Sequence, residues 1–509
     1  MRSIVVLVAG LVLGWIDRAL DLSRTFLVRW IGVKRLHWIS KHLVPWSLLY
    51  WIGGTLRRNF VMWRNCGVIL GVVLLTWKTQ SRLLGSSGNG KMQTKWNVTA
   101  AVPLPRRLVY DNGLGKTPIM GWSGWNKYEC KINEKIVFGN TDALVRHGLD
   151  QLGYNYVIVG NISQSHGFFG YYFLCLDDCW AAYKRDKQGN LKSHPTTFPS
   201  GMKALADYAH SKGLKFGLYS DAGRRTCIGH RAGSEDHEIR DAKTFASWGV
   251  DYLKYDNCFH KKHYYPHLRY PVMSEALNKS GRPIFYTICE WGEDHPALWA
   301  GKYANSWRTS LDVKDRWDRI QILADDNNMW AAYAGPGGWN DPDMLQVGNG
   351  RMSVAEYRSH FSIWSIMKAP LIIGCELRKI REEHLEIYKN KEIIDINQDP
   401  LGIQARKVSR QGRCKCREVW AGPLSGKRIV LALWNRDWRR VAIKVNWFDL
   451  GLEPGVSVRV RDLWKHEDWS ERQQDGFEVA IDSHDCGVYI LSDVRLTSDN
   501  VYVIADHVF

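Results

Sequence analysis

The chain has 509 residues, of which 45% are hydrophobic and 24% charged, a composition typical of a globular protein with room for two or three domains. Its net charge of +17 does not indicate nucleic-acid binding, because residues 1–110 alone carry 16 Lys and Arg against two acidic residues. The other 399 residues carry a net charge of only +3, so we expect no basic groove for phosphates in the globular part.

Residues 1–110 form a basic extension with two apolar runs, at 4–16 and 66–77, followed by a Gly/Ser-rich linker. Both runs are shorter than the about 20 residues that a helix needs to cross a bilayer. Each follows a basic residue, as the apolar part of a signal peptide does. Because Met62 closely precedes the second run, we expect translation to start there and residues 1–61 to be an upstream extension. The alternative is that one run anchors the chain to a membrane.

Between residues 111 and 402 short apolar strands alternate with amphipathic helical patterns. Several of these helical patterns have apolar residues at three- and four-residue spacing and end at a Gly. Eight strands with helices between them predict a (β/α)8 barrel over 111–402, and a doubly wound open sheet is the alternative. The strand-like segments are 118–122, 215–221, 251–256, 283–291, 306–312, 337–343 and 369–374, with one more expected near 154–178.

Nearly every predicted strand ends in polar or acidic residues. In a barrel these ends lie on one rim, where active sites are built. A single Asp after a strand is more often a helix cap, but seven strands with such ends predict a pocket lined by carboxylates and aromatic rings. The residues at these ends are Trp125, Asp177, Asp178, Tyr219, Asp221, Lys254, Asp256, Glu290, Arg308, Asp312, Asp341 and Asp343.

Carboxylates without a metal-binding motif, in a chain with 25 Trp, indicate glycoside hydrolysis, although a Trp-rich core explains the Trp content equally well. Hydrolysis of a glycoside needs one carboxylate at the anomeric carbon and another that protonates the leaving oxygen. Asp256 suits the first role, because the nearby cation of Lys254 lowers a carboxyl pKa. The acid must come from another strand, and the spacing leaves Asp312 and Asp343 open.

Six motifs in order resemble glycoside hydrolase family 27, and most closely its plant-type α-galactosidases (melibiases). They are MGWSGWNKYEC, LDDCW, GLYSDAG, YLKYDNC, SWRTSLD and GPGGWNDPDML. The resemblance runs from about residue 112 to 402 and continues more weakly to about 492. It implies a retaining exo-glycosidase without cofactor or metal. Such an enzyme releases terminal α-D-galactosyl groups from galacto-oligosaccharides, galactomannans or galactolipids by double displacement.

The resemblance also implies roles for single residues. Asp256 matches the nucleophile of the family and Asp312 its acid/base. Two disulfide bonds are implied, Cys130–Cys179 and Cys227–Cys258, and the second would tie the loop after the third strand to the strand with Asp256. The positions that match sugar contacts are Trp125, Asp177, Asp178, Tyr219, Lys254, Arg308 and Asp343.

Glu290 and Trp291 bear on which sugar is accepted. Relatives that accept N-acetylgalactosamine have small residues that make room at the sugar 2-position. The bulkier and more polar pair in this chain favours a free 2-hydroxyl group, and hence galactose. β-L-Arabinopyranose has the same ring stereochemistry and is the alternative substrate.

Residues 403–509 contain strand patterns without helices between them, which predicts an antiparallel β-sandwich. We expect this sandwich to pack against the barrel, and a lectin-like role is the alternative. Residues 158–175 are an atypical insertion in the second strand region, since the family joins GYNYV almost directly to LDDCW. We interpret the insertion as a gene-model artefact. If it is present, we expect YYFLCLDD (171–178) to replace YNYV as the strand, with 158–170 expelled near the bottom of the barrel.

Two hypotheses from different classes remain. The first is an α-galactosidase of the secretory pathway, extracellular, in the cell wall or in the vacuole. The second is a catalytically impaired relative that binds sugar or is tethered to a membrane. Intact Asp256, Asp312 and Arg308 favour the first. The expected partner is the carbohydrate substrate, with no nucleic acid, and membrane contact is expected only through the N-terminal extension.

Overall fold

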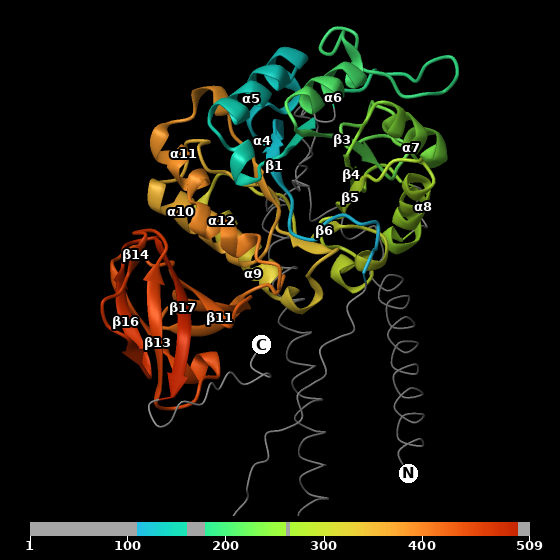
Figure 1. The fold of residues 1–509 in the computed structure, drawn as a ribbon. Helices are drawn as coiled ribbons and strands as arrows, with labels where there is room; N and C mark the ends of the chain where they lie inside the picture. Colours follow the sequence, from blue (N-terminus) through green and yellow to red (C-terminus); the bar gives the residue numbers. More distant parts are fainter. Residues whose placement is uncertain (1–108, 160–178, 261–264, 497–509) are drawn as a thin grey trace, which may run out of the picture. The chain divides into compact units, whose positions relative to one another are not determined.

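The computed structural model describes residues 109–159, 179–260 and 265–496 (Figure 1). The basic extension, with its apolar runs and Met62, lies outside the described residues, as do Asp177, Asp178 and most of the insertion. Among the described residues, no helix is long and apolar enough to cross a membrane.

Eight parallel strands form one sheet in the order β7-β6-β5-β4-β3-β2-β1-β8. Leu345, just after β7, pairs in parallel with Ile373 of β8, so the two ends of the sheet meet. The predicted (β/α)8 barrel is therefore confirmed. The strands are β1 Met120–Ser123, β2 Tyr156–Val159, β3 Lys215–Asp221, β4 Tyr252–Asp256, β5 Phe285–Ile288, β6 Ser306–Arg308, β7 Trp339–Asp341 and β8 Leu371–Ile373.

Helices surround these strands (Figure 1). They are α4 Trp125–Tyr128, α5 Glu134–Arg146, α6 Gly201–Ser211, α7 Glu238–Ser247, α8 Pro266–Asn278, α9 Trp317–Asn328, α10 Val354–Ile366, α11 Glu382–Lys389 and α12 Lys391–Asn397. Side chains along each strand point alternately into the barrel and outward against the helices, which gives two packed layers. In β4, Leu253 and Tyr255 pack into the layer between sheet and helices, whereas Tyr252 packs inside the barrel. Lys254 and Asp256 share the inner face with Tyr252, because side chains alternate along a strand.

The second strand is Tyr156–Val159, so the expectation that residues 171–178 would replace it is wrong. Asn155 fixes its register before the strand begins: its N–H donates to the Met120 carbonyl (3.0 Å) and its carbonyl accepts from Lys215 N–H (2.7 Å). All four strand residues are buried and pair with β3, and the first three also pair with β1 on the other side. The expectation rested on the fact that residues 171–178 run directly into Asp177 and Asp178 without a bridging loop. Residues 158 and 159, the first two of the insertion, belong to β2, and the described residues break off at the carboxyl end of this strand.

The C-terminal part is an antiparallel β-sandwich. Its larger sheet has the order β14-β13-β17-β11-β10-β9, with β15 beside β13, and its smaller sheet pairs β12 with β16. Val419 and Leu431 of the large sheet and Ile443 of the small sheet belong to one core. The strands are β9 Arg406–Gln411, β10 Arg417–Leu424, β11 Arg428–Asn435, β12 Val441–Asn446, β13 Val456–Asp462, β14 Glu467–Asp468, β15 Gln473–Gln474, β16 Gly476–Ile481 and β17 Cys486–Leu496.

The large sheet also packs on the barrel. Trp420 and Trp434 belong to the same core as α10, and the Trp434 ring lies edge-on to Trp317 of α9, with 5.6 Å between the ring centroids. Most of the largest fully buried side chains are Trp, which places much of the Trp content in the two cores: Trp122, Trp307, Trp339, Trp364, Trp420, Trp434 and Trp447.

Ion pairs reinforce this contact between barrel and sandwich. Asp325 of α9 accepts two hydrogen bonds from the Arg436 guanidinium (both 2.8 Å) and also pairs with Lys407 of β9. The same two cations reach the fully buried carboxylate of Glu418 at 3.1 and 2.8 Å. Four charged groups from both parts of the protein therefore form one network.

We expect Asp325→Asn to weaken this network. Burial by itself raises the carboxyl pKa, but hydrogen bonds and charge from Arg436 and Lys407 outweigh it and lower the pKa of Asp325. Because the pKa is lower in the folded than in the unfolded state, the ionised carboxylate stabilises the fold at pH values above the unfolded pKa of about 4. This stabilisation is lost as the pH falls through the folded pKa. The variant should lose about 1 kcal/mol near pH 6, a modest figure because the carboxylate is 43% exposed. At strongly acidic pH it should melt together with the parent.

Thermal unfolding between pH 2.5 and 7 measures this difference. Asp318→Asn is the matched control, since Asp318 is on the same helix and pairs only with exposed Arg316. A melting difference that stays constant over the whole pH range would contradict the ionic origin.

Deletions at the insertion test the register of β2. Removing 159–175 puts Leu176 in the place of Val159, one buried apolar residue for another, and places Asp177 next on the inner face beside Tyr219. Removing 158–175 shifts the register by one residue and puts Asp177 in the place of Val159, which is fully buried against the helices. The second deletion should cost about 3 kcal/mol or more, whereas the first should melt at or above the full chain. Equal melting temperatures for both deletions would refute this register.

Candidate active site

The site begins with the register between β3 and β4. Tyr219 pairs with Lys254, and Asp221 pairs with Asp256, so neighbouring strands bring these four residues to one end of the barrel. All four are buried, and Asp256 has no exposed surface. Asp256 is the last residue of β4, and its carboxylate is on the inner face of the barrel because side chains alternate along a strand.

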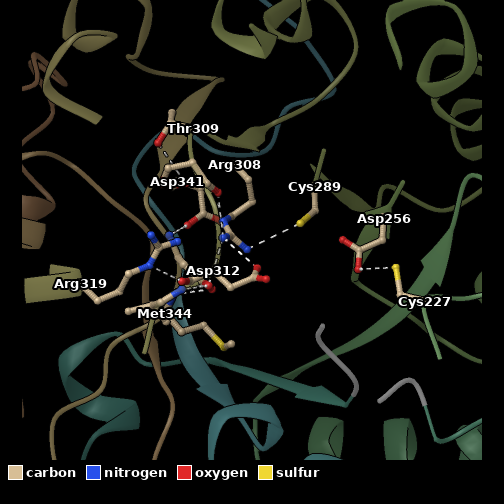
Figure 2. Close-up of polar contacts among 12 residues, drawn as sticks. Cys227, Asp256, Cys289, Arg308, Thr309, Asp312, Arg319, Asp341 and Met344 are labelled. Atoms are coloured by element: carbon tan, nitrogen blue, oxygen red, sulfur yellow. Dashed lines mark hydrogen bonds and ion pairs between the residues drawn. The ribbon is translucent and has the colours of Figure 1, made fainter. Parts of the chain in front are cut away.

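Asp256 lies in a nearly dry setting. Its Oδ2 is 3.8 Å from Cys227 Sγ (Figure 2), which is a van der Waals contact because the bonded sulfur has no proton to donate. Within the described residues, neither Asp256 Oδ1 nor Lys254 Nζ has a hydrogen-bond partner. Burial raises the pKa of Asp256 to about 6 although the charge of Lys254 lowers it. The expected effect of the lysine is present, but desolvation outweighs it.

Arg308 organises the opposite side of the site. It ends β6 with 1% of its side chain exposed, and its Nη2 lies 3.1 Å from Asp312 Oδ1 and 3.2 Å from Asp343 Oδ2. Its Nη1 lies 3.6 Å from Cys289 Sγ, and Figure 2 shows Cys289 between Arg308 and Asp256. Burial raises the pKa of Asp312, while the charge of Arg308 opposes this. The guanidinium thus binds two carboxylates and a thiol.

Asp312 lies in a loop, because β6 ends at Arg308 rather than continuing to 312. Asp343 likewise follows β7 and has a φ of 85°, a left-handed conformation that is unusual for Asp. The bend is stabilised by the Asp343 N–H, which donates to Asp341 Oδ1 (2.8 Å). Asp343 Oδ2 in turn accepts from Val313 N–H (2.9 Å), so the turn after β7 supports the loop with Asp312.

Glu290 follows β5 and is fully buried, and burial raises its pKa to about 8. Its Oε2 accepts from Asp294 N–H (2.7 Å), while Oε1 has no partner among the described residues. Near neutral pH this carboxyl group is therefore mostly protonated, and it is able to donate a hydrogen bond. Trp291 follows with a φ of 56° and packs against Tyr219 and Cys227.

The structure contains the disulfide bonds Cys130–Cys179 and Cys227–Cys258. The second joins the β3–α7 loop to the end of β4. Asp221 lies beside it, but the two sulfurs are bonded to each other and leave no thiolate for a metal ion. Trp125 follows β1 and packs with the inner residues of the barrel.

The predicted residues fall into three sets. The structure brings one set together at the carboxyl end of the barrel: Tyr219, Lys254, Asp256, Glu290, Trp291, Arg308, Asp312 and Asp343. Trp125 belongs to the packing inside the barrel. Asp177 and Asp178 lie outside the described residues.

Two further residues were missed by the sequence reasoning. Cys289 directly follows β5 in the stretch ICEW, and its place between a strand and Glu290 was the available signal. Arg319, in α9, donates from Nε to the Asp312 carbonyl (2.7 Å; Figure 2). No pattern in the sequence marks this contact, because the side chain reaches back from a helix to the preceding loop.

The arrangement has the parts that glycoside hydrolysis needs. It has two buried carboxylates, Asp256 at the end of β4 near Lys254 and Asp312 in the loop after β6 against Arg308. Buried polar atoms without partners call for a ligand rich in hydrogen-bonding groups, such as a sugar. A raised carboxyl pKa lets one acid keep a proton for a leaving group, while a nearby cation keeps the other ionised.

Comparison with known proteins agrees with this chemistry. The family model described as alpha galactosidase A (Melibiase_2) matches residues 117–399, and the model of the alpha galactosidase C-terminal beta sandwich domain (Melibiase_C) matches 415–491. Alpha-galactosidase 3 of Arabidopsis thaliana is 51% identical over 425 residues, which are 83% of this chain and 93% of that protein.

Solved structures give the same result. The crystal structure of alpha-galactosidase I from Mortierella vinacea has a TM-score of 0.69 and 36% identity, covering 75% of this chain and 98% of that one. The alpha-galactosidase of Saccharomyces cerevisiae with raffinose has a TM-score of 0.66 and 29% identity, covering 75% and 98%. The chain therefore belongs to the alpha galactosidase A (melibiase) family, which is glycoside hydrolase family 27.

Proposed function

We propose that the protein hydrolyses terminal α-D-galactosyl groups with retention at the anomeric carbon. One observation carries the proposal: two buried carboxylates, Asp256 and Asp312, follow different strands of one barrel, and each has its own cation. Family membership supports the galactosyl specificity, because the relatives named above are α-galactosidases.

In the first step, ionised Asp256 attacks the anomeric carbon. The bond from this carbon to the aglycone oxygen breaks as protonated Asp312 donates its proton to that oxygen. In the second step, Asp312 removes a proton from the attacking water, and the bond between the sugar and Asp256 breaks. Burial raises the pKa of Asp312, which suits a group that must first carry a proton.

The sugar would be bound by the polar and aromatic groups of the same rim. Lys254 Nζ has no partner among the described residues, which leaves it available to a sugar hydroxyl group. Protonated Glu290 would donate to a 2-hydroxyl group, and the bulky pair of Glu290 and Trp291 would exclude a 2-acetamido group. The full proposed set of sugar contacts is Trp125, Asp177, Asp178, Tyr219, Lys254, Glu290, Trp291, Arg308 and Asp343.

Natural substrates would be galacto-oligosaccharides such as raffinose, the ligand of the yeast relative, together with galactomannans or galactolipids. Turnover of p-nitrophenyl α-D-galactoside against p-nitrophenyl β-L-arabinopyranoside decides between galactose and the arabinopyranose alternative. If neither substrate is turned over, the protein is instead a catalytically impaired relative.

Asp256→Asn should abolish turnover while galactose binding stays measurable, since the amide keeps the shape but cannot attack. In the parent, kcat/KM should fall about tenfold per pH unit below about pH 6, where the carboxylate takes up a proton. The sign follows from the raised pKa: protonation begins at a higher pH than for an exposed Asp. A pH profile that stays flat down to pH 4 would refute this role.

The anomer released first provides a separate check of the mechanism. Two displacements at one carbon give net retention, so proton NMR of early product should show α-galactose before mutarotation. Early β-galactose would exclude Asp256 as a covalent nucleophile.

Asp312→Asn should impair substrates with poor leaving groups most, because only those need strong protonation. We expect kcat/KM to fall about 100-fold or more for raffinose, and by much less for a dinitrophenyl galactoside. Equal losses on both substrates would contradict the acid role of Asp312. Asp318→Asn, an exposed carboxylate six residues away, is the control and should leave both rates unchanged.

A further inference from the structure

The peptide bond that follows Asp312 is held at both ends. Its carbonyl oxygen accepts from Arg319 Nε at 2.7 Å, and its N–H, which belongs to Val313, donates to Asp343 Oδ2 at 2.9 Å. One end is thus bonded to a cation and the other to an anion, and both bonds are of the strong charge-assisted kind.

This peptide matters because Asp312 lies in a loop. Residues between β6 and α9 belong to no strand, and within the described residues the side chain of Asp312 makes one hydrogen bond, with Arg308. Fixing the plane of the next peptide restricts the backbone torsion that joins it to the Asp312 Cα atom. The direction of the Cα–Cβ bond is then set, and with it the place of the carboxyl group.

Arg319 is well placed for this task. It is the third residue of α9 and is half-buried, and among the described residues its side chain makes one hydrogen bond, to the Asp312 carbonyl. Burial lowers the pKa of its guanidinium, while Asp312 opposes this, so the cation lies within electrostatic reach of the acid/base.

We propose that Arg319 is a positioning residue of the reaction, which holds the acid/base carboxyl of Asp312 in line with the leaving oxygen by fixing the peptide that follows it. The proposal rests on the proposed function, because it assigns a use to the acid role of Asp312. Arg319 itself touches neither the sugar nor the reacting atoms.

Such a role predicts a selective defect. General acid catalysis needs the donor within hydrogen-bond reach of the leaving oxygen, and a displacement of about 1 Å costs about 100-fold in rate. Loss of the Arg319 contact should therefore lower kcat/KM, which reports the first step alone, for substrates that need the proton. A merely structural role would lower the rates on all substrates alike.

The test compares Arg319→Gln, Arg319→Lys and the control Arg316→Gln on raffinose and on 2,4-dinitrophenyl α-galactoside. Arg316 precedes the same helix but pairs with Asp318 at the surface. We expect Arg319→Gln to reduce kcat/KM on raffinose about 10- to 100-fold and to change kcat/KM on the dinitrophenyl substrate by less than about threefold. Arg319→Lys, which keeps a cationic donor, should recover most of the raffinose rate, and the control should match the parent.

Equal losses of Arg319→Gln on both substrates, no loss on raffinose, or the same loss in the Arg316→Gln control would each overturn the positioning role. A parent enzyme that turns over neither substrate would instead overturn the proposed function. The two failures are therefore distinguishable within one set of measurements.

Discussion

The buried guanidinium of Arg308 is the interaction on which the rest of the site depends. Carboxylates moved out of water lose several kcal/mol of hydration each, and without a cation they would take up protons or force the site open. Arg308 offsets this loss for Asp312 and Asp343 at once, and its other nitrogen lies against Cys289. Removing it would leave two like charges facing each other in a dry pocket, so the geometry of this half of the site follows from one side chain at the end of β6.

The barrel makes such a concentration of charge possible. Each parallel strand delivers its last inward residue to the same rim, and the neighbouring helices cover the outer face with apolar side chains. Asp256 and Glu290 are buried because of their place in the barrel and not because of adjacent residues in the sequence. Desolvation is accordingly the largest cause of both raised pKa values. The same carboxyl groups on a surface loop would titrate as ordinary acids and have no catalytic use.

Strand–helix alternation, polar strand ends and motif order were sufficient to predict the barrel, because each depends only on nearby residues. Such patterns could not predict three features: the end of β6, the identity of β2 and the contact of Arg319 with Asp312. The end of β6 depends on where its hydrogen bonds to the neighbouring strands stop. The identity of β2 depends on the register of Asn155 against two other strands. The third depends on a long side chain that turns back over its own helix. The pKa of Asp256 was misjudged for a related reason: a lysine two residues away is visible in the sequence, whereas the degree of burial is not.

The disulfide bond between Cys227 and Cys258 links the chemistry of the site to the redox state of its surroundings. It is the covalent connection between the β3–α7 loop and the strand that carries Asp256. Reduction of this bond would leave two thiols beside Asp256, in addition to that of Cys289. Newly made protein would in that case expose its reaction centre to oxidants and to soft metal ions before any sugar arrived. Maturation where thiols are oxidised therefore keeps reactive thiols away from Asp256 as well as closing the loop beside it.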